Sequence, residues 1–148
     1  MEREIVNPTM EQLCDLMCGK PEEDDMINEY EIKIEASVIV SAQDIDDIVC
    51  TALEGGINYW CDCAKVEGEY LGTWASDQVS RGGVLKLYDE EEEEWLELTR
   101  DNFLMGLKLY LEKDNSILCG REIDTCQVDA DVADQIIQYA IFGDVIYG

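Results

Sequence analysis

Six consecutive acidic residues, Asp89 to Glu94, are flanked by two short apolar runs, Val84-Leu85-Lys86-Leu87-Tyr88 and Trp95-Leu96-Glu97-Leu98. Short runs of this kind on either side of a polar turn are typical of a β-hairpin. The sequence therefore predicts two strands joined by a turn that is made entirely of acidic residues. No other stretch of the chain has so many charges in so few residues.

Two further segments have strand patterns. Apolar and polar side chains alternate from Tyr30 to Val40, which is the clearest strand pattern in the chain and predicts a strand with one polar face. Residues 57–66 are rich in aromatic residues and Cys and predict another strand. Residues 67–82 have no clean period, so we expect an ordered loop there, and loops of this length are often functional.

Four segments have a capping residue followed by apolar residues at helical spacing. The predicted N-caps are Thr9, Ser41, Thr99 and Asp129. Together with the strands, these helices predict an α+β domain whose mainly antiparallel sheet of about four strands has helices packed on one face. We expect a single acidic domain over residues 1–148, in which the N-terminal helix and acidic loop of residues 1–28 are peripheral.

The chain has a strong excess of negative charge. Thirty-five Asp and Glu stand against ten Lys and Arg, with no His, which gives a formal net charge of −25. Residues 1–31, 32–88, 89–114 and 115–148 each have an acidic excess. Because an acidic tail would concentrate its charge in one block, we assign the charge to the folded body. Such a field repels nucleic acid and anionic membranes and attracts basic surfaces.

The composition also predicts a folded protein. Hydrophobic residues make up 47% of the chain and there are only two Pro, so disorder is not expected. No apolar run approaches the ~20 residues of a membrane span, and the first thirty residues lack a basic leader with an apolar stretch. We therefore expect a soluble, cytoplasmic protein.

Most residues that catalytic sites need are missing from the sequence. Without His, the Ser-His and Cys-His pairs are excluded. The motifs of phosphate-binding loops, dinucleotide-binding folds, zinc proteases and calcium-binding loops do not occur either. Two carboxylates suited to glycoside hydrolysis would arise by chance among so many acidic residues. We predict no enzyme, no catalytic residue and no cofactor.

The seven cysteines are expected to be reduced and structural. Their number is odd, as suits free thiols in a cytosol, and their spacings differ from the paired Cys-x-x-Cys of a structural zinc site. Cys often behaves as a small buried hydrophobe, so we place these residues in the core and predict no metal ligand. The cysteines are Cys14, Cys18, Cys50, Cys61, Cys63, Cys119 and Cys126.

Three stretches resemble segments of small acidic proteins that phages and mobile elements of Gram-positive, often gut, bacteria encode. They are Ala52-Leu53-Glu54-Gly55-Gly56-Ile57-Asn58-Tyr59-Trp60, Ser80-Arg81-Gly82-Gly83 and Ala140-Ile141-Phe142-Gly143-Asp144. The similarity runs from about residue 35 to the end of the chain. It implies a phage setting and assigns no functional residues. By analogy, small acidic phage proteins without an active site include anti-CRISPR and other anti-defence inhibitors.

The leading hypothesis is an inhibitor that binds a basic nucleic-acid-binding surface of a host defence complex, such as a CRISPR effector, as a DNA mimic. A compact chain of this length is about 38 Å across, and a duplex of that length has about 22 phosphate charges, which is similar to this chain's charge. The predicted contact residues are Asp89, Glu90, Glu91, Glu92, Glu93, Glu94, Glu22, Glu23, Asp24 and Asp25, with Tyr70 and Trp74 as aromatic anchors.

Three alternatives stay open from the sequence. The first is a phage accessory or structural protein whose acidity serves solubility, because charge runs usually have that role. The second is a sponge for nucleotide signals, which would need a basic pocket that few cations are available to build. The third is a low-affinity binder of divalent cations. Binding to nucleic acid or membrane is not expected, and a homodimer is left open.

Overall fold

The computed structural model describes residues 29–148 of the chain. The chain divides into two compact units, Met1–Glu35 and Ala36–Gly148. The described part of the first unit, residues 29–35, is extended and contains neither helix nor strand. The helix predicted from Thr9 and the acidic loop Glu22–Asp25 lie outside the described residues. The sites below all belong to the second unit.

The second unit contains a three-stranded antiparallel sheet, in which β1 (Cys61–Val66), β2 (Leu85–Asp89) and β3 (Glu94–Leu98) lie in that order. The predicted hairpin is β2 and β3. Two further strands, β4 (Leu118–Cys119) and β5 (Glu122–Ile123), form a short separate hairpin. The expected α+β class with a small antiparallel sheet is confirmed.

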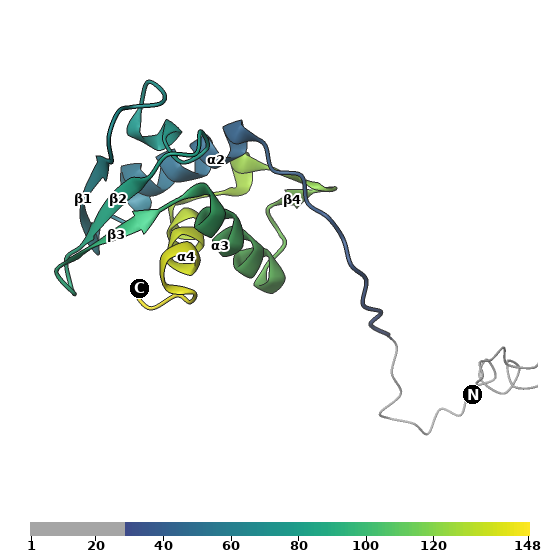
Figure 1. The fold of residues 1–148 in the computed structure, drawn as a ribbon. Coiled ribbons are helices and arrows are strands. Elements are labelled where there is room, and N and C mark those ends of the chain that lie inside the picture. Colours follow the sequence, from purple (N-terminus) through teal and green to yellow (C-terminus); the bar gives the residue numbers. More distant parts are fainter. Residues whose placement is uncertain (1–28) are drawn as a thin grey trace, which may run out of the picture. The chain divides into compact units, whose positions relative to one another are not determined.

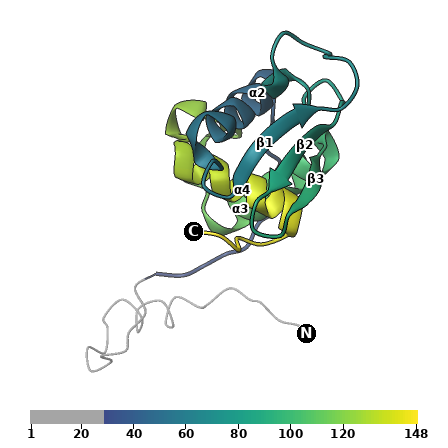
Figure 2. The ribbon, with the colours of Figure 1, turned by 90° about the vertical axis from the view of Figure 1, so that its left-hand side faces the viewer.

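Three helices pack together with this sheet. They are α2 (Ala42–Thr51), α3 (Arg100–Lys113) and α4 (Ala130–Phe142). In Figure 1 β1, β2 and β3 lie to the left of α3 and α4, and in Figure 2 these three strands lie in front of the two helices. The expected packing of helices on one face of the sheet is therefore confirmed. Among residues 29–148, no helix combines the length and the apolar character needed to cross a membrane.

Each helix begins at the residue that the sequence predicts. The side chain of Ser41 accepts a hydrogen bond from the amide of Asp44, and Thr99 and Asp129 make the corresponding bonds at α3 and α4. These bonds satisfy backbone donors that have no partner within the helix. Gly143 ends α4 in the left-handed conformation (φ 78°), which glycine adopts without the steric cost of a Cβ.

The core lies between the inner face of the sheet and the helices. Leu85, Leu87 and Leu98 point inward from β2 and β3 and are fully buried together with Phe103 and Ile136 of the helices. Helices α3 and α4 approach closely at Gly106, where a Cβ would collide with the backbone of Ala140. The absence of a side chain at this position therefore sets how closely the two helices pack.

The predicted strand at residues 30–40 does not form. Tyr30 and Ile32 are each 83% exposed and Ile34 is 78% exposed. Only Ile39 pairs, through an isolated parallel bridge to Glu122 in which its amide donates to the carbonyl of Arg121 at 2.7 Å. Alternation defines two faces of an extended chain, but a strand also needs a neighbouring edge with free backbone groups. Among residues 36–40, Ile39 is the residue that finds such an edge, and residues 29–35 contain no strand.

The strand predicted over residues 57–66 is shorter than expected. It begins at Cys61 because α2 is followed by a single turn of π-helix, η1 (Ala52–Gly56), and then by a tight turn. The amides of Trp60 and Cys61 both donate to the carbonyl of Ile57 in this turn. The turn places Trp60 in the core, where it is 1% exposed.

The cysteines do not all lie in the core as predicted. Cys61 is buried and Cys50 is partly buried, whereas Cys63, Cys119 and Cys126 are exposed. The prediction of core positions is wrong for these three, because each lies on the solvent side of a strand or in a short surface turn. Cys14 and Cys18 lie outside the described residues.

The structure makes a simple prediction about the extended segment. Replacing Ile34 with Ala should change the free energy of unfolding by no more than about 0.5 kcal/mol, because the side chain is mostly in water. Replacing Ile48 of α2, which is fully buried, should cost about 2–5 kcal/mol. Urea denaturation of the two variants measures both values. A large loss at Ile34 would mean that this residue packs against a partner.

Candidate functional site

The acidic turn consists of Glu90, Glu91, Glu92 and Glu93 together with Glu94, the first residue of β3, and all five are exposed. It links β2 to β3 and projects beyond the end of the sheet (Figure 1). Glu93 has a φ of 55°, a left-handed conformation that is uncommon for residues other than Gly, Asn and Asp. Within residues 29–148, none of the five glutamates forms an ion pair. Their charge is therefore available to a partner.

Asp89 behaves differently from the other five acidic residues and corrects the sequence prediction. It is 0% exposed, so it does not present its charge at the surface. The single Tyr147 hydroxyl donates to its carboxylate, with the two oxygens 2.9 and 3.0 Å away, and the amides of Glu91 and Glu92 donate at 2.9 and 3.3 Å. Asp89 therefore holds the turn in place. Strand alternation would have indicated this burial, because Asp89 shares a face with Leu85 and Leu87.

Tyr147 is itself held by α4. The side-chain oxygen of Gln138 accepts from the amides of Ile146 and Tyr147, each at 2.8 Å, and its nitrogen donates to the Tyr147 carbonyl at 3.2 Å. The same nitrogen donates to Asp134 at 2.9 Å. The hydrogen bonds thus run from α4 through residues 146–147 to Asp89 and the acidic turn.

Asp134 is a second buried carboxylate in this network. It accepts from the Trp60 ring nitrogen at 2.9 Å and from the Tyr59 hydroxyl at 2.6 Å. The Trp60 ring also stacks on the ring of Tyr147, with centroids 5.5 Å apart. The turn after η1, helix α4 and the C-terminal residues are therefore joined around one polar cluster.

Both tyrosines stay protonated at neutral pH. Burial, followed by the hydrogen bond to Asp89 and the charge of that carboxylate, raises the pKa of Tyr147 to about 12. Burial and the hydrogen bond to Asp134 raise the pKa of Tyr59 to about 12. Each hydroxyl therefore keeps its proton and donates a hydrogen bond to its carboxylate. A carboxylate without a cationic partner requires such a donor.

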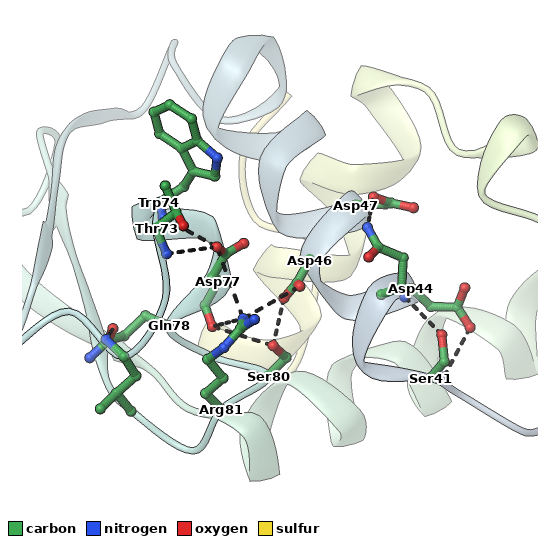
Figure 3. Close-up of polar contacts among 12 residues, drawn as sticks. Ser41, Asp44, Asp46, Asp47, Thr73, Trp74, Asp77, Gln78, Ser80 and Arg81 are labelled. Carbon is green, nitrogen blue, oxygen red and sulfur yellow. Dashed lines mark hydrogen bonds and ion pairs between the residues drawn. The ribbon is translucent and has the colours of Figure 1, made fainter.

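The loop predicted at residues 67–82 is ordered by two of its own side chains. Gln78 is buried and bridges the loop, accepting from the amide of Leu71 at 3.0 Å and donating to the carbonyl of Glu69 at 3.2 Å. Asp77, in the short 3₁₀ helix η2 (Ala75–Asp77), accepts from the amides of Thr73 and Trp74 at 3.1 and 3.2 Å (Figure 3). The loop therefore has a defined conformation.

Asp46 joins this loop to α2. The Ser80 hydroxyl donates to Asp46 at 2.5 Å, and the Arg81 guanidinium lies 3.6 Å from the same carboxylate (Figure 3). Arg81 also donates to the carbonyl of Asp77 at 3.2 Å. These contacts fix the position of η2 relative to α2.

The two predicted aromatic anchors are both at the surface of this loop. Tyr70 is 60% exposed and Trp74 is 68% exposed. They lie at the end of the sheet where β1 leads into β2, whereas the acidic turn follows the other end of β2. At about 3.4 Å per residue, the five residues of β2 separate these ends by about 17 Å. The structure therefore does not bring the anchors and the turn together.

In the part of the chain that the structure describes, no three Cys, Asp or Glu side chains are grouped so that they would hold a metal ion. Comparison of the chain with protein-family models, curated proteins and solved structures finds no match. The geometry suits recognition of another molecule by an exposed acidic turn and by an exposed Trp on an ordered loop.

Removing the Tyr147 hydroxyl should loosen the acidic turn. A Tyr147→Phe variant leaves the buried Asp89 with only its two amide donors, so we expect the free energy of unfolding to fall by about 1–3 kcal/mol. Hydrogen exchange at the amides of Glu91 and Glu92 should become faster. Urea denaturation and exchange followed by NMR measure the two effects.

Tyr70→Phe is the matched control, because it removes the same atom from an exposed side chain. It should leave both measurements unchanged. If Tyr147→Phe also exchanged at the wild-type rate, Tyr147 would not be part of what holds the turn.

Added salt should stabilise the protein. Screening shortens the Debye length from about 10 Å at 0.1 M salt to about 3 Å at 1 M, which weakens repulsion among the unpaired acidic side chains. The melting temperature should therefore rise across a sodium chloride series. A variant in which Glu90, Glu91, Glu92 and Glu93 are all Gln should gain less from salt. A melting temperature that falls steadily would contradict this expectation.

Proposed function

We propose that this protein binds a basic, nucleic-acid-binding surface of another protein and blocks it by electrostatic competition. The observation that carries the proposal is the acidic turn. Five exposed glutamates without an ion pair inside residues 29–148 project from a hairpin whose base is fixed by Asp89. The protein would act by occupying that surface, and no chemical step is involved.

The anchoring of the turn supports this role. A flexible acidic loop would lose conformational freedom when it bound, which reduces affinity. Here the β-ladder, the bond from the Glu90 amide to the Trp60 carbonyl and the Asp89 carboxylate fix the turn before binding. The formal charge of −25 adds long-range attraction to a basic surface and raises the association rate at low salt.

The proposed partner is a host defence complex, with a CRISPR effector as one example, and the proposed setting is a phage that encodes the protein as an inhibitor. The resemblance of three segments to small acidic phage proteins supports the setting. The similarity between the charge of the chain and that of a duplex of equal length supports mimicry of DNA.

Binding of an anionic nucleotide is less well supported. Lys86 lies 3.7 and 3.8 Å from Glu67 and Glu97, and Arg81 lies between Asp46 and Asp77. These cations are engaged by carboxylates of the same chain. A nucleotide phosphate would have to displace those contacts within a strongly negative field.

The first experiment identifies the partner and tests competition. The tagged protein is incubated with a nuclease-treated bacterial lysate at low and high salt, and a captured protein is then purified. We expect the captured protein to bind duplex DNA or RNA and to release it when our protein is added. A captured protein that keeps its nucleic acid in the presence of excess protein would contradict the proposal.

The second experiment tests the turn. Replacing Glu90, Glu91, Glu92 and Glu93 with Gln removes four charges and preserves size, so binding should weaken by about tenfold or more, mainly through a slower on-rate. Surface plasmon resonance measures the rates.

The control variant replaces Glu69, Glu112 and Glu122 with Gln and Asp131 with Asn, which removes four exposed charges elsewhere. It should lose clearly less affinity than the turn variant. Equal losses in the two variants would mean that overall charge, and not the turn, carries the binding.

A further inference from the structure

A depression in the surface lies beside Trp74, between α2 with η1 and the loop that contains η2. Its volume is about 400 Å³. One wall comes from α2 and η1 and the other from η2 and the residue before it. The lining residues are Cys50, Leu53, Glu54, Trp74, Ala75 and Ser76. We refer to this depression as the Trp74 pocket.

The walls of the Trp74 pocket are mostly apolar and uncharged. Leu53, Ala75 and the Trp74 ring supply hydrocarbon surface. Burial, followed by the hydrogen bond and charge of Glu54, raises the pKa of the Cys50 thiol, so this group is neutral at physiological pH. Cys50 therefore lines the pocket as a neutral thiol and not as a reactive thiolate.

The charged groups at and near the pocket are acidic. Glu54 is exposed and forms no ion pair within residues 29–148. Asp47, one helical turn before Cys50, acts on the same thiol through its charge. An apolar pocket with a carboxylate at its edge that forms no ion pair within residues 29–148 disfavours anions and favours a group that combines a hydrocarbon part with a positive charge.

We propose that the Trp74 pocket binds an arginine side chain that a partner protein presents. The aliphatic part of the side chain would lie against Leu53 and Ala75, and the guanidinium would stack on the Trp74 ring and pair with Glu54. The volume is near the lower limit of ligand pockets, about 300–1,000 Å³, and so suits one long side chain better than a larger ligand.

Arginine fits this chemistry better than lysine. Its guanidinium is planar and weakly hydrated, so it stacks on an aromatic ring and accepts a carboxylate in the same plane. A cation over the face of Trp raises affinity by about 2- to 30-fold. Trp and Arg are also the residues most enriched at the centres of protein interfaces.

The pocket is fixed before a ligand binds. Asp77 holds the Trp74 amide at 3.2 Å, and Asp46 of α2 binds both Ser80 and Arg81 of the loop (Figure 3). Asp46 thus ties together the two segments that supply the walls. Because neither wall has to move, little conformational entropy is lost on binding.

The arginine site is independent of the acidic turn. Only the identity of the partner rests on the proposed function. A nucleic-acid-binding surface is rich in arginine and would present such a side chain to the pocket. Long-range attraction by the turn would act on the association rate. A desolvated arginine in the Trp74 pocket would act on the dissociation rate.

A short peptide tests the site without a partner protein. The tripeptide acetyl-Gly-Arg-Gly-amide is titrated into the full-length, isotopically labelled protein and followed by NMR, with Trp fluorescence in parallel. We expect shifts confined to the residues around the Trp74 pocket. The citrulline peptide is neutral and nearly isosteric with the arginine peptide. Its affinity for the protein should be lower, by up to about tenfold.

Two variants locate the interaction. Trp74→Leu keeps an apolar wall and removes the ring, whereas Glu54→Gln removes one charge and preserves size, and each should weaken the arginine peptide by several-fold. Trp95→Leu changes an exposed Trp of β3, and Glu69→Gln removes an exposed charge outside the pocket. Neither control should alter the affinity.

Equal binding of the arginine and citrulline peptides, or shifts centred on residues 90–94, would overturn the arginine site. Tighter binding of an apolar peptide such as acetyl-Gly-Leu-Gly-amide would also overturn it and assign the pocket to an apolar side chain. Either result leaves the competition experiment on the partner protein unaffected. The two proposals therefore fail separately.

Discussion

The arrangement of the acidic turn depends on one buried carboxylate. Asp89 is removed from water without a cationic partner among residues 29–148, so it must be surrounded by hydrogen-bond donors to be tolerated. Two donors are backbone amides of the turn, and the third is the Tyr147 hydroxyl. Tyr147 in turn needs Gln138 of α4 to keep it in place. The hydrogen bonds that the buried carboxylate requires thereby link the hairpin, the last helix and the C-terminal residues.

Local signals made much of the fold predictable. The caps at Ser41, Thr99 and Asp129 and the hairpin pattern at residues 84–98 depend on neighbouring residues, and each of these elements forms where expected. The strand pattern at residues 30–40 shows the limit of such signals. Alternation describes only the segment itself, and pairing depends on whether another strand offers an edge.

The sites were only partly predictable for the same reason. The five exposed glutamates of the turn can be recognised from sequence because the turn is local. The burial of Asp89 follows from strand alternation, but its bond to Tyr147 joins residues far apart in the chain. The Trp74 pocket also depends on distant residues, because Asp46 of α2 binds Ser80 and Arg81 of the loop that contains η2. The sequence indicates Tyr70 and Trp74 as aromatic anchors. The sheet topology is needed to show that they lie away from the acidic turn.

If the acidic turn and the Trp74 loop both bind a partner as proposed, their positions at opposite ends of β2 make the molecule a bivalent ligand with a fixed spacing. A partner that engages one end holds the other at a high effective concentration, so two weak contacts together give strong avidity. The gain is lost if the partner's two sites are spaced differently. A short, rigid strand thus selects partners by geometry: a surface with the right charge but the wrong spacing is bound at only one end and released quickly.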